Sequence, residues 1–463
     1  MHDLLIKNGR VIDPESNTDA QRHVAVDNGK ISVIEDIWGS KLHGACEIDA
    51  TGLIVSPGFI DLHAHGQDTE NYMVQAMDGV TTALELEIGT ADVDQWYDIR
   101  KNKTPINFGV SSGHIPARIS VMEDGFSLIP SKDAAHRPAN TEELKHILET
   151  IRVGLNRGGL AVGFGLQYTP AASRTEIIEA FKIASEFSAP CHVHIRGMGN
   201  PPNKGNKLGA IESLQEVIAN AAITGAPLHV VHISSVGLSV TEKLLEIIQD
   251  ARVNGLDVTT ECYPYSAGMT LIESAIFDKG WQENLGVTYE NLLWPSTGET
   301  LNENSFTKYR SQGGMVVVNF IPESSMIASV TSHLTSIATD GWLKNSKGHP
   351  RTSGSYSKLL SEYVRKNKTM TLMDAIRKSS LMPAQRLEGR APDFLRKGRI
   401  KLGADADLCI FDPVRIIDNS TYSNPSAAST GFKYVFVNGV PLVTEGILKG
   451  NLFPGKPARA PII

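Results

Sequence analysis

Eight short apolar runs recur along this chain, most of them separated by amphipathic stretches. Three of these stretches, residues 141–158, 176–188 and 210–225, carry apolar residues at spacings of three and four, which predicts helices. Strands that alternate with helices indicate a parallel sheet, and eight such units fit a closed barrel better than an open sheet. We therefore predict an α/β fold built on a (β/α)8 barrel of the TIM type. The runs are residues 54–62, 80–88, 106–113, 158–167, 189–195, 227–233, 256–263 and 331–340.

Both ends of the chain instead predict β-structure. Short alternating runs fill residues 1–55, and the Asn-Gly pairs at 8–9 and 28–29 are typical of type I′ hairpin turns. The same pattern returns after residue 390, where residues 438–439 form a third such pair. We expect the two ends to meet in one small β-sandwich domain.

These patterns divide the chain into three parts. Residues 1–55 form the first part of the small β domain, 56–390 the barrel and 391–463 the second part of the small domain. The segment between the seventh and eighth strands, about 270–329, is too long for a single crossover. We expect it to be an insertion over the barrel mouth that acts as a lid.

Composition excludes several classes of protein. Hydrophobic residues make up 41% of the 463, enough for a large core, and the formal net charge of −7 argues against a nucleic-acid or anionic-membrane binder. No apolar run approaches the roughly 20 residues of a membrane span. The four scattered cysteines form no CxxC and favour a reducing compartment. We expect a cytoplasmic protein with no nucleic-acid or membrane partner, and leave open whether it is a homo-oligomer.

Histidines stand at the carboxyl ends of the predicted strands, where barrel enzymes place their working residues. His63 and His65 end the first strand two residues apart. Because side chains alternate along a strand, both imidazoles face the same way and can share one metal ion. His192 and His194 also share a face, and His194 lies nearer the mouth. We assign His194 as a ligand and His192 as a buried, hydrogen-bonded neighbour.

The sixth and eighth strands complete this set. His229 and His232 fall on opposite faces of the sixth strand, so we expect only one to face inward, and His232 stands at the strand end. Asp340 follows the apolar run of the eighth strand. A carboxylate there is costly unless it binds metal or carries a proton. Together these residues predict a metal site on one barrel.

This order of ligands resembles the amidohydrolase superfamily, and the resemblance covers nearly the whole chain. Closer motifs are similar to the N-acyl-D-amino-acid deacylase group, and LELE on the second strand resembles its D-glutamate deacylase branch. The motifs are PGFIDLHAHG, GVTTALELE, GFGLQYTP, HIRG, GLDVTTECYPYSAG and KGRIKLGADADLCIFDP.

The resemblance implies roles for individual residues. His63 and His65 match the ligands of one metal ion, completed by Asp340, and His194 and His232 match those of a second. Asp340 also matches the catalytic acid and base. Arg351 and Tyr263 match residues that hold the substrate carboxylate and position the amide. The implied cofactor is one or two zinc ions.

Three departures from the family pattern bear on this site. The bridging cysteine after the second strand is absent, the fourth strand has no lysine, and Ser234 replaces the lysine that follows the strand-six histidine. Two cations need an anion between them, and Glu85 and Glu87 are in phase on the second strand. We assign Glu87, nearer the strand end, as the bridge, with Glu85 as the alternative. A carboxylate bridge should accept zinc and also tolerate manganese or cobalt.

Two further residues complete the predicted site. Arg196 is expected near the mouth, where with Arg351 it would let the enzyme hold two carboxylates, as in an N-acyl-D-glutamate. His114 is a candidate donor to the oxyanion. We therefore predict hydrolysis of small N-acyl-D-amino acids, with a preference for an acidic side chain such as that of N-acyl-D-glutamate. The alternatives are a cyclic-amide hydrolase similar to dihydroorotases and hydantoinases, and a scaffold without catalysis.

Overall fold

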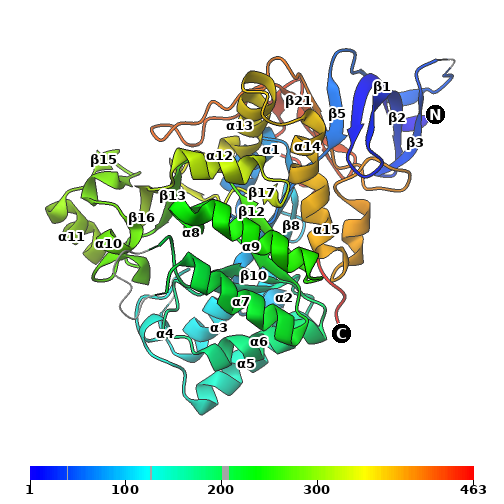
Figure 1. Cartoon of the computed structure of the whole chain (residues 1–463). Coiled ribbons are helices and arrows are strands. Elements are labelled where there is room, and N and C mark those ends of the chain that lie inside the picture. The colour runs from blue at the N-terminus through cyan, green and yellow to red at the C-terminus, as the bar shows by residue number, and fades with distance from the viewer. Residues whose placement is uncertain (39, 126–127, 201–207) are drawn as a thin grey trace.

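A parallel barrel lies at the centre of the computed structural model, which describes residues 1–38, 40–125, 128–200 and 208–463 (Figure 1). Its strands are hydrogen-bonded in chain order, and each predicted run contains one of them. Just beyond the first and last strands, Ala64 and Gly341 form a parallel bridge that closes the barrel. The strands are β6 (Phe59–Asp61), β7 (Val80–Thr90), β8 (Asn107–Gly113), β9 (Val162–Gly165), β10 (Cys191–His194), β11 (Leu228–Val230), β12 (Val258–Cys262) and β17 (Thr335–Ile337).

Helices cover the outside of the barrel, and the three predicted from apolar spacing are α5 (Thr141–Asn156), α6 (Arg174–Glu186) and α7 (Ala210–Thr224) (Figure 1). In α5 the side chains of Ile147 and Ile151, one turn apart, are fully buried. No helix in the described parts of the chain is long and apolar enough to cross a membrane. The other helices include α1 (Thr69–Met77), α3 (His114–Val121), α9 (Thr241–Val253), α12 (Glu323–Thr331), α13 (Arg351–Lys358), α14 (Leu372–Ile376) and α15 (Met382–Glu388).

The two chain ends form one nine-stranded sheet beside the barrel. Strand β20 pairs antiparallel with β5, so the C-terminal strands continue directly from the N-terminal ones. The first predicted run, residues 54–62, contains two strands and not one. Strand β5 belongs to the small sheet and β6 belongs to the barrel. The strands are β1 (His2–Asp13), β2 (Thr18–Asp27), β3 (Lys30–Asp36), β4 (Gly44–Asp49), β5 (Ile54–Pro57), β20 (Leu408–Phe411), β21 (Phe432–Val437), β22 (Val440–Thr444) and β23 (Ile447–Leu448).

Two of the three predicted Asn-Gly hairpins are confirmed. The pairs at 28–29 and 438–439 have positive φ at both residues, as a type I′ turn requires. The hairpin predicted at 8–9 is wrong, because β1 continues through these residues. Asn8 has a φ of 60°, and the pairing with β2 shifts register between Ile6 and Gly9. The pair therefore forms an irregularity within one strand, and not a turn between two strands.

The segment between β12 and α12 forms a four-stranded sheet on the side of the barrel away from the small β domain (Figure 1). Aromatic side chains fill its core, with Trp281 stacked on Phe306 and Trp294 on Tyr309. We call residues 267–319 the insertion. Its elements include β13 (Ala267–Leu271), α10 (Trp281–Leu285), β14 (Leu292–Trp294), β15 (Glu299–Thr300), α11 (Glu303–Gln312) and β16 (Met315–Asn319).

Candidate metal centre

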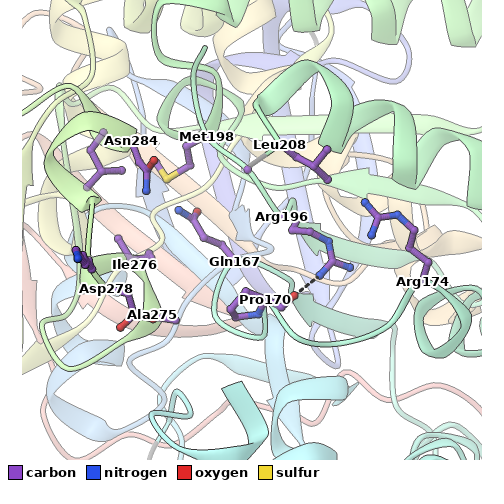
Figure 2. Close-up of a pocket in the computed structure, with 13 residues that line it drawn as sticks. Gln167, Pro170, Arg174, Arg196, Met198, Leu208, Ala275, Ile276, Asp278 and Asn284 are labelled. Atoms are coloured by element: carbon purple, nitrogen blue, oxygen red, sulfur yellow. Dashed lines mark hydrogen bonds between the residues drawn. The ribbon is translucent and has the colours of Figure 1, made fainter. Parts of the chain in front are cut away.

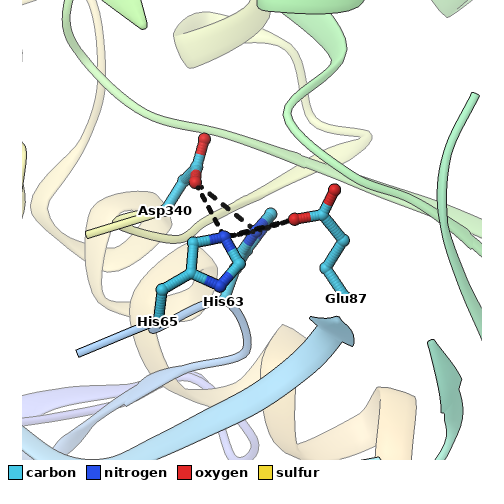
Figure 3. Close-up of side chains that lie close together, drawn as sticks. All are labelled: His63, His65, Glu87 and Asp340. Carbon is cyan, nitrogen blue, oxygen red and sulfur yellow. Dashed lines mark hydrogen bonds and ion pairs between the residues drawn. The ribbon is translucent and has the colours of Figure 1, made fainter. Parts of the chain in front are cut away.

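Four side chains from three barrel strands converge at the carboxyl end of the barrel (Figure 3). His63 and His65 follow β6, Glu87 lies on β7 and Asp340 follows β17. One ligand atom from each lies within 4.8 Å of the others. The Nε2 atoms of His63 and His65 lie 2.8 and 3.2 Å from Oε2 of Glu87, and 3.5 and 3.2 Å from Oδ1 of Asp340. Two imidazoles and two carboxylates therefore point at one small volume.

Each of the two imidazoles contacts a further carboxylate through its Nδ1 atom, on the side away from the shared volume. Nδ1 of His63 lies 2.6 Å from Glu261 on β12, and Nδ1 of His65 lies 2.8 Å from Glu85 on β7. Because an ionised carboxylate only accepts hydrogen bonds, it keeps the ring proton on Nδ1. The lone pair of each ring is then on Nε2, directed at the shared volume, which is the arrangement of metal-binding histidines.

Glu87 also belongs to a second group with His194 and His232. Its Oε1 lies 2.9 Å from Nδ1 of His194 and 3.9 Å from Nε2 of His232. The hydroxyl of Ser235 donates to the His232 carbonyl and so accepts from Nδ1 of the same ring at 2.9 Å, leaving Nε2 free to bind. Glu87 thus joins the two groups through its two oxygens, while Glu85 contacts His65 from behind.

The electrostatics of the group formed by His63, His65, Glu87 and Asp340 favour a positive charge among its carboxylates. Burial alone would raise the pKa of Glu87, but the imidazoles of His63, His194 and His232 hold it well below its usual value. Burial would lower the pKa of His63, yet Asp340, Glu87 and Glu261 raise it well above the ordinary histidine value. Buried carboxylates that outnumber nearby fixed cations need a cation among them, and the donor set fits a divalent metal ion.

Two of these residues have unusual backbone conformations. Asp340 has a φ of 49° and His232 a φ of 32°, in the left-handed region that non-glycine residues rarely adopt. The prediction that only one of His229 and His232 faces inward is wrong. Strand β11 ends at Val230, so the alternation of faces stops there and the turn at His232 directs its ring back to Glu87. His229 also faces inward, 3.0 Å from Glu261.

Arg351 and Tyr263, the residues predicted to bind the substrate, lie close to Asp340. Nη1 of Arg351 is 2.9 Å from Oδ2 of Asp340, and its guanidinium lies 4.5 Å from the centre of the Tyr263 ring. The Arg351 side chain is 1% exposed, and its Nε has no hydrogen-bond partner among the described residues. This buried guanidinium therefore has hydrogen-bond donors available for a ligand beside the candidate metal centre.

Two small cavities flank Asp340. One, the His232-side cavity, holds about 40 Å³ and reaches His194, His232 and Tyr263. The other, the His65-side cavity, holds about 20 Å³ and reaches His65 and Arg351. A larger outer cavity of about 470 Å³ shares the side chains of Met198, Ile276 and Leu285 with the first. The candidate metal centre is thus connected to the surface on the insertion side.

Arg196 lines the outer cavity (Figure 2), whereas Asp340 lines the two small cavities. Its Nε and Nη2 donate to Glu216 on α7 at 3.1 and 3.0 Å, and Nη1 donates to the Pro170 carbonyl. The guanidinium is therefore largely satisfied by its own protein. This geometry does not support the prediction that Arg196 binds a second substrate carboxylate beside Arg351.

His114 is not part of the site, which corrects the prediction of an oxyanion donor. It is the first residue of α3, so its fully buried ring packs on Phe164 outside the barrel. Its Nε2 lies 2.7 Å from Glu176, which also accepts two hydrogen bonds from Arg118. His192 is buried as predicted and stacks on His229, but neither of its nitrogens has a hydrogen-bond partner among the described residues.

Two residues beside the site were missed by the sequence analysis. Glu261 links His63 and His229 through its two oxygens. It stands two residues before Tyr263, so strand alternation could have indicated that both face the interior. Tyr168 lines both small cavities and contacts the His194 ring edge-on. It lies beyond the end of β9, where no periodicity gives the direction of a side chain.

Comparisons with known proteins agree with this architecture. A model of the amidohydrolase family matches residues 47–105. A D-aminoacylase of Alcaligenes xylosoxydans xylosoxydans is 24% identical, with 97% of this chain and 96% of that protein covered. An N-acyl-D-glutamate deacylase of the same organism is 25% identical, with 94% and 93% covered.

Two solved structures have the same fold over almost the whole chain. An N-acyl-D-glutamate deacylase of Bordetella bronchiseptica, complexed with zinc and a phosphonate inhibitor, has a TM-score of 0.82 at 22% identity and covers 99% of this chain and 100% of that one. A D-aminoacylase studied for its binuclear metal centre also has a TM-score of 0.82, at 21% identity, with the same coverage.

The closed barrel and its small second sheet are the fold shared with these solved structures, and residues 47–105 match the amidohydrolase family model. The relatives that match nearly the whole chain confirm the predicted resemblance to the N-acyl-D-amino-acid deacylase group.

Proposed function

We propose that this chain is a metal-dependent hydrolase that cleaves the amide bond of N-acyl-D-amino acids. The convergence of Asp340 with His63, His65 and Glu87, beside the buried guanidinium of Arg351, carries the proposal. It combines a candidate metal centre, a proton carrier and a carboxylate binder within one small volume. The related D-aminoacylase and N-acyl-D-glutamate deacylase support the same reaction.

The described side chains fit a centre of two divalent ions. His63, His65 and Asp340 would hold one, His194 and His232 the other, and Glu87 would bridge them through its two oxygens. Nitrogen and carboxylate donors suit zinc, and they also suit manganese or cobalt. A divalent ion there supplies Lewis acidity, which polarises an amide carbonyl and lowers the pKa of water.

The chain's own residues would position the substrate and move the proton. Arg351 would bind the substrate carboxylate with its free donors, and Tyr263 would pack beside it. Burial alone would raise the pKa of Asp340, but Arg351 and His63 hold it below its ordinary value. Asp340 is therefore ionised, and can take a proton from the attacking water and pass it to the leaving amine.

The alternatives have less support from this site. Strand β9, VGFG, offers no lysine for a carbamate bridge of the kind expected in a cyclic-amide hydrolase, and Glu87 belongs to both groups of candidate ligands instead. A scaffold without catalysis has no physical need for six inward-facing ligands at one barrel end.

A panel of N-acetyl-D- and N-acetyl-L-amino acids tests the proposed function. Chromatography of the released amino acid should show turnover of D-substrates that is at least about tenfold faster than that of the matching L-isomers. Arg351, the metal centre and the cavity walls would contact three different groups around the chiral carbon, and the relatives act on D-substrates. Faster turnover of the L-isomers would contradict the proposed configuration, and release from neither series would contradict the reaction.

Arg351→Lys should raise KM for an N-acyl-D-amino acid about tenfold or more. A lysine keeps the charge but cannot supply the paired donors of a guanidinium or stack in the same way on Tyr263. Steady-state kinetics on the purified variant checks this expectation. An unchanged KM would show that the substrate carboxylate binds elsewhere.

We also propose that the insertion acts as a lid. The two small cavities together are far smaller than the roughly 300 Å³ of a typical ligand pocket, and β16 contributes Met315 and Val318 to their walls. The insertion is therefore placed where its movement would control access to the metal centre. A bound substrate analogue should slow proteolysis within residues 267–319 at least about threefold. Equal cleavage rates with and without the analogue would count against a closing lid.

A further inference from the structure

The two cavities beside Asp340 differ from the outer cavity in their charge. Among the described residues that line the two small cavities, Arg351 is the one lysine or arginine. The outer cavity has three, namely Arg174, Arg196 and Lys279. A substrate bound at the metal centre therefore meets a single lysine or arginine side chain, and its other parts meet the remaining walls.

Those walls are apolar on both sides of Asp340. The rest of the His65-side cavity is formed largely by buried side chains such as Ile88, Ile129 and Leu271. The His232-side cavity, apart from its polar groups at the metal centre, is lined largely by Met198, Ile276, Leu285, Val318 and Phe320.

An N-acyl amino acid has three branches around its reacting amide: the α-carboxylate, the side chain and the acyl group. If Arg351 binds the α-carboxylate, the other two branches have only these apolar walls to contact. A second carboxylate would lose its hydration without gaining a cation, whichever cavity receives it. Selectivity against a charged side chain thus does not depend on which of the two cavities receives the side chain and which receives the acyl group.

We propose that the chain acts on N-acyl-D-amino acids whose side chain and acyl group are both uncharged, in preference to acidic substrates. This inference rests on the proposed function and narrows it. Arg196, the residue expected to bind a second carboxylate, already shares Glu216 with Arg174, at 3.0 and 3.8 Å. Arg174 and Arg196 thus share one carboxylate, and Lys279 is the further lysine or arginine among the described residues of the outer cavity, which lies beyond the two small cavities that flank Asp340.

Three substrates of similar length test this proposal on the unmodified enzyme: N-acetyl-D-methionine, N-acetyl-D-glutamine and N-acetyl-D-glutamate. Their kcat/KM values should fall in that order, with methionine about 100-fold or more above glutamate. Glutamate turned over as fast as methionine would overturn the inference while leaving the proposed function intact. No turnover of any of the three would overturn both.

Lysine substitutions in the cavity walls test whether these walls cause the selectivity against acidic substrates. Val318→Lys and Met315→Lys each add a charge to one of the two small cavities, and Val318→Gln and Met315→Gln are the matched uncharged controls. One lysine variant should raise the glutamate-to-methionine ratio about tenfold or more over its control. If both fold normally by circular dichroism and neither changes the ratio, the walls do not set the selectivity.

A loss of glutamate turnover in Lys279→Ala would assign the acidic group to the outer cavity and overturn the inference.

Discussion

Asp340→Asn should lower kcat/KM for an N-acyl-D-amino acid at least about 100-fold while the barrel remains folded. Asparagine keeps the shape of the side chain but cannot take and return a proton, and general acid–base catalysis typically contributes this much or more. Bound metal should fall less than activity, because His63, His65 and Glu87 remain. Turnover and metal content, measured on the same preparation, check both parts.

One control variant separates catalysis from structure in this experiment. Asp61→Asn alters another carboxylate of the same barrel end, which is fully buried and accepts hydrogen bonds from Thr339 and from the His63 amide. It should reduce the free energy of unfolding more than Asp340→Asn does, because it leaves buried donors poorly paired. An Asp340→Asn enzyme that keeps more than about a tenth of its activity would show that another group moves the proton.

Glu87→Gln should remove one of two bound ions and most of the activity. The amide has one weakly donating oxygen in place of two charged ones, so it cannot neutralise two cations held a few ångströms apart. Elemental analysis after dialysis against zinc checks the number of ions per chain.

Glu85→Gln is the matched control for Glu87→Gln. Glu85 lies two residues earlier on β7 and contacts Nδ1 of His65 from behind. Its loss should keep both ions while weakening metal affinity about 10- to 100-fold, as replacements behind metal ligands do. If Glu87→Gln retains two ions and Glu85→Gln loses one, the bridge must be reassigned to Glu85.

Much of the fold follows from periodicity alone. Each of the eight runs contains a barrel strand, because a strand buried on both faces is an apolar segment of the right length between helices. The in-phase placement of Glu85 and Glu87 on β7 was also predictable, since faces alternate along a continuous strand.

Prediction failed where the strands end or where a partner is distant in sequence. His232 lies beyond the last residue of β11 in a left-handed turn, so the alternation of faces along a strand does not extend to it. The prediction that His229 and His232 face opposite ways was therefore wrong. Nothing local to Arg196 indicates that Glu216, twenty positions away on α7, binds its guanidinium. His114 begins a helix, which turns its ring outward.

Metal titration of the metal-depleted enzyme tests the central claim most directly. Release of methionine from N-acetyl-D-methionine should be absent from the depleted enzyme and should return as zinc, manganese or cobalt is added, over the first two equivalents per chain. Full activity in the depleted enzyme, or none after reconstitution of a folded enzyme with any of the three metals, would contradict a metal-dependent deacylase.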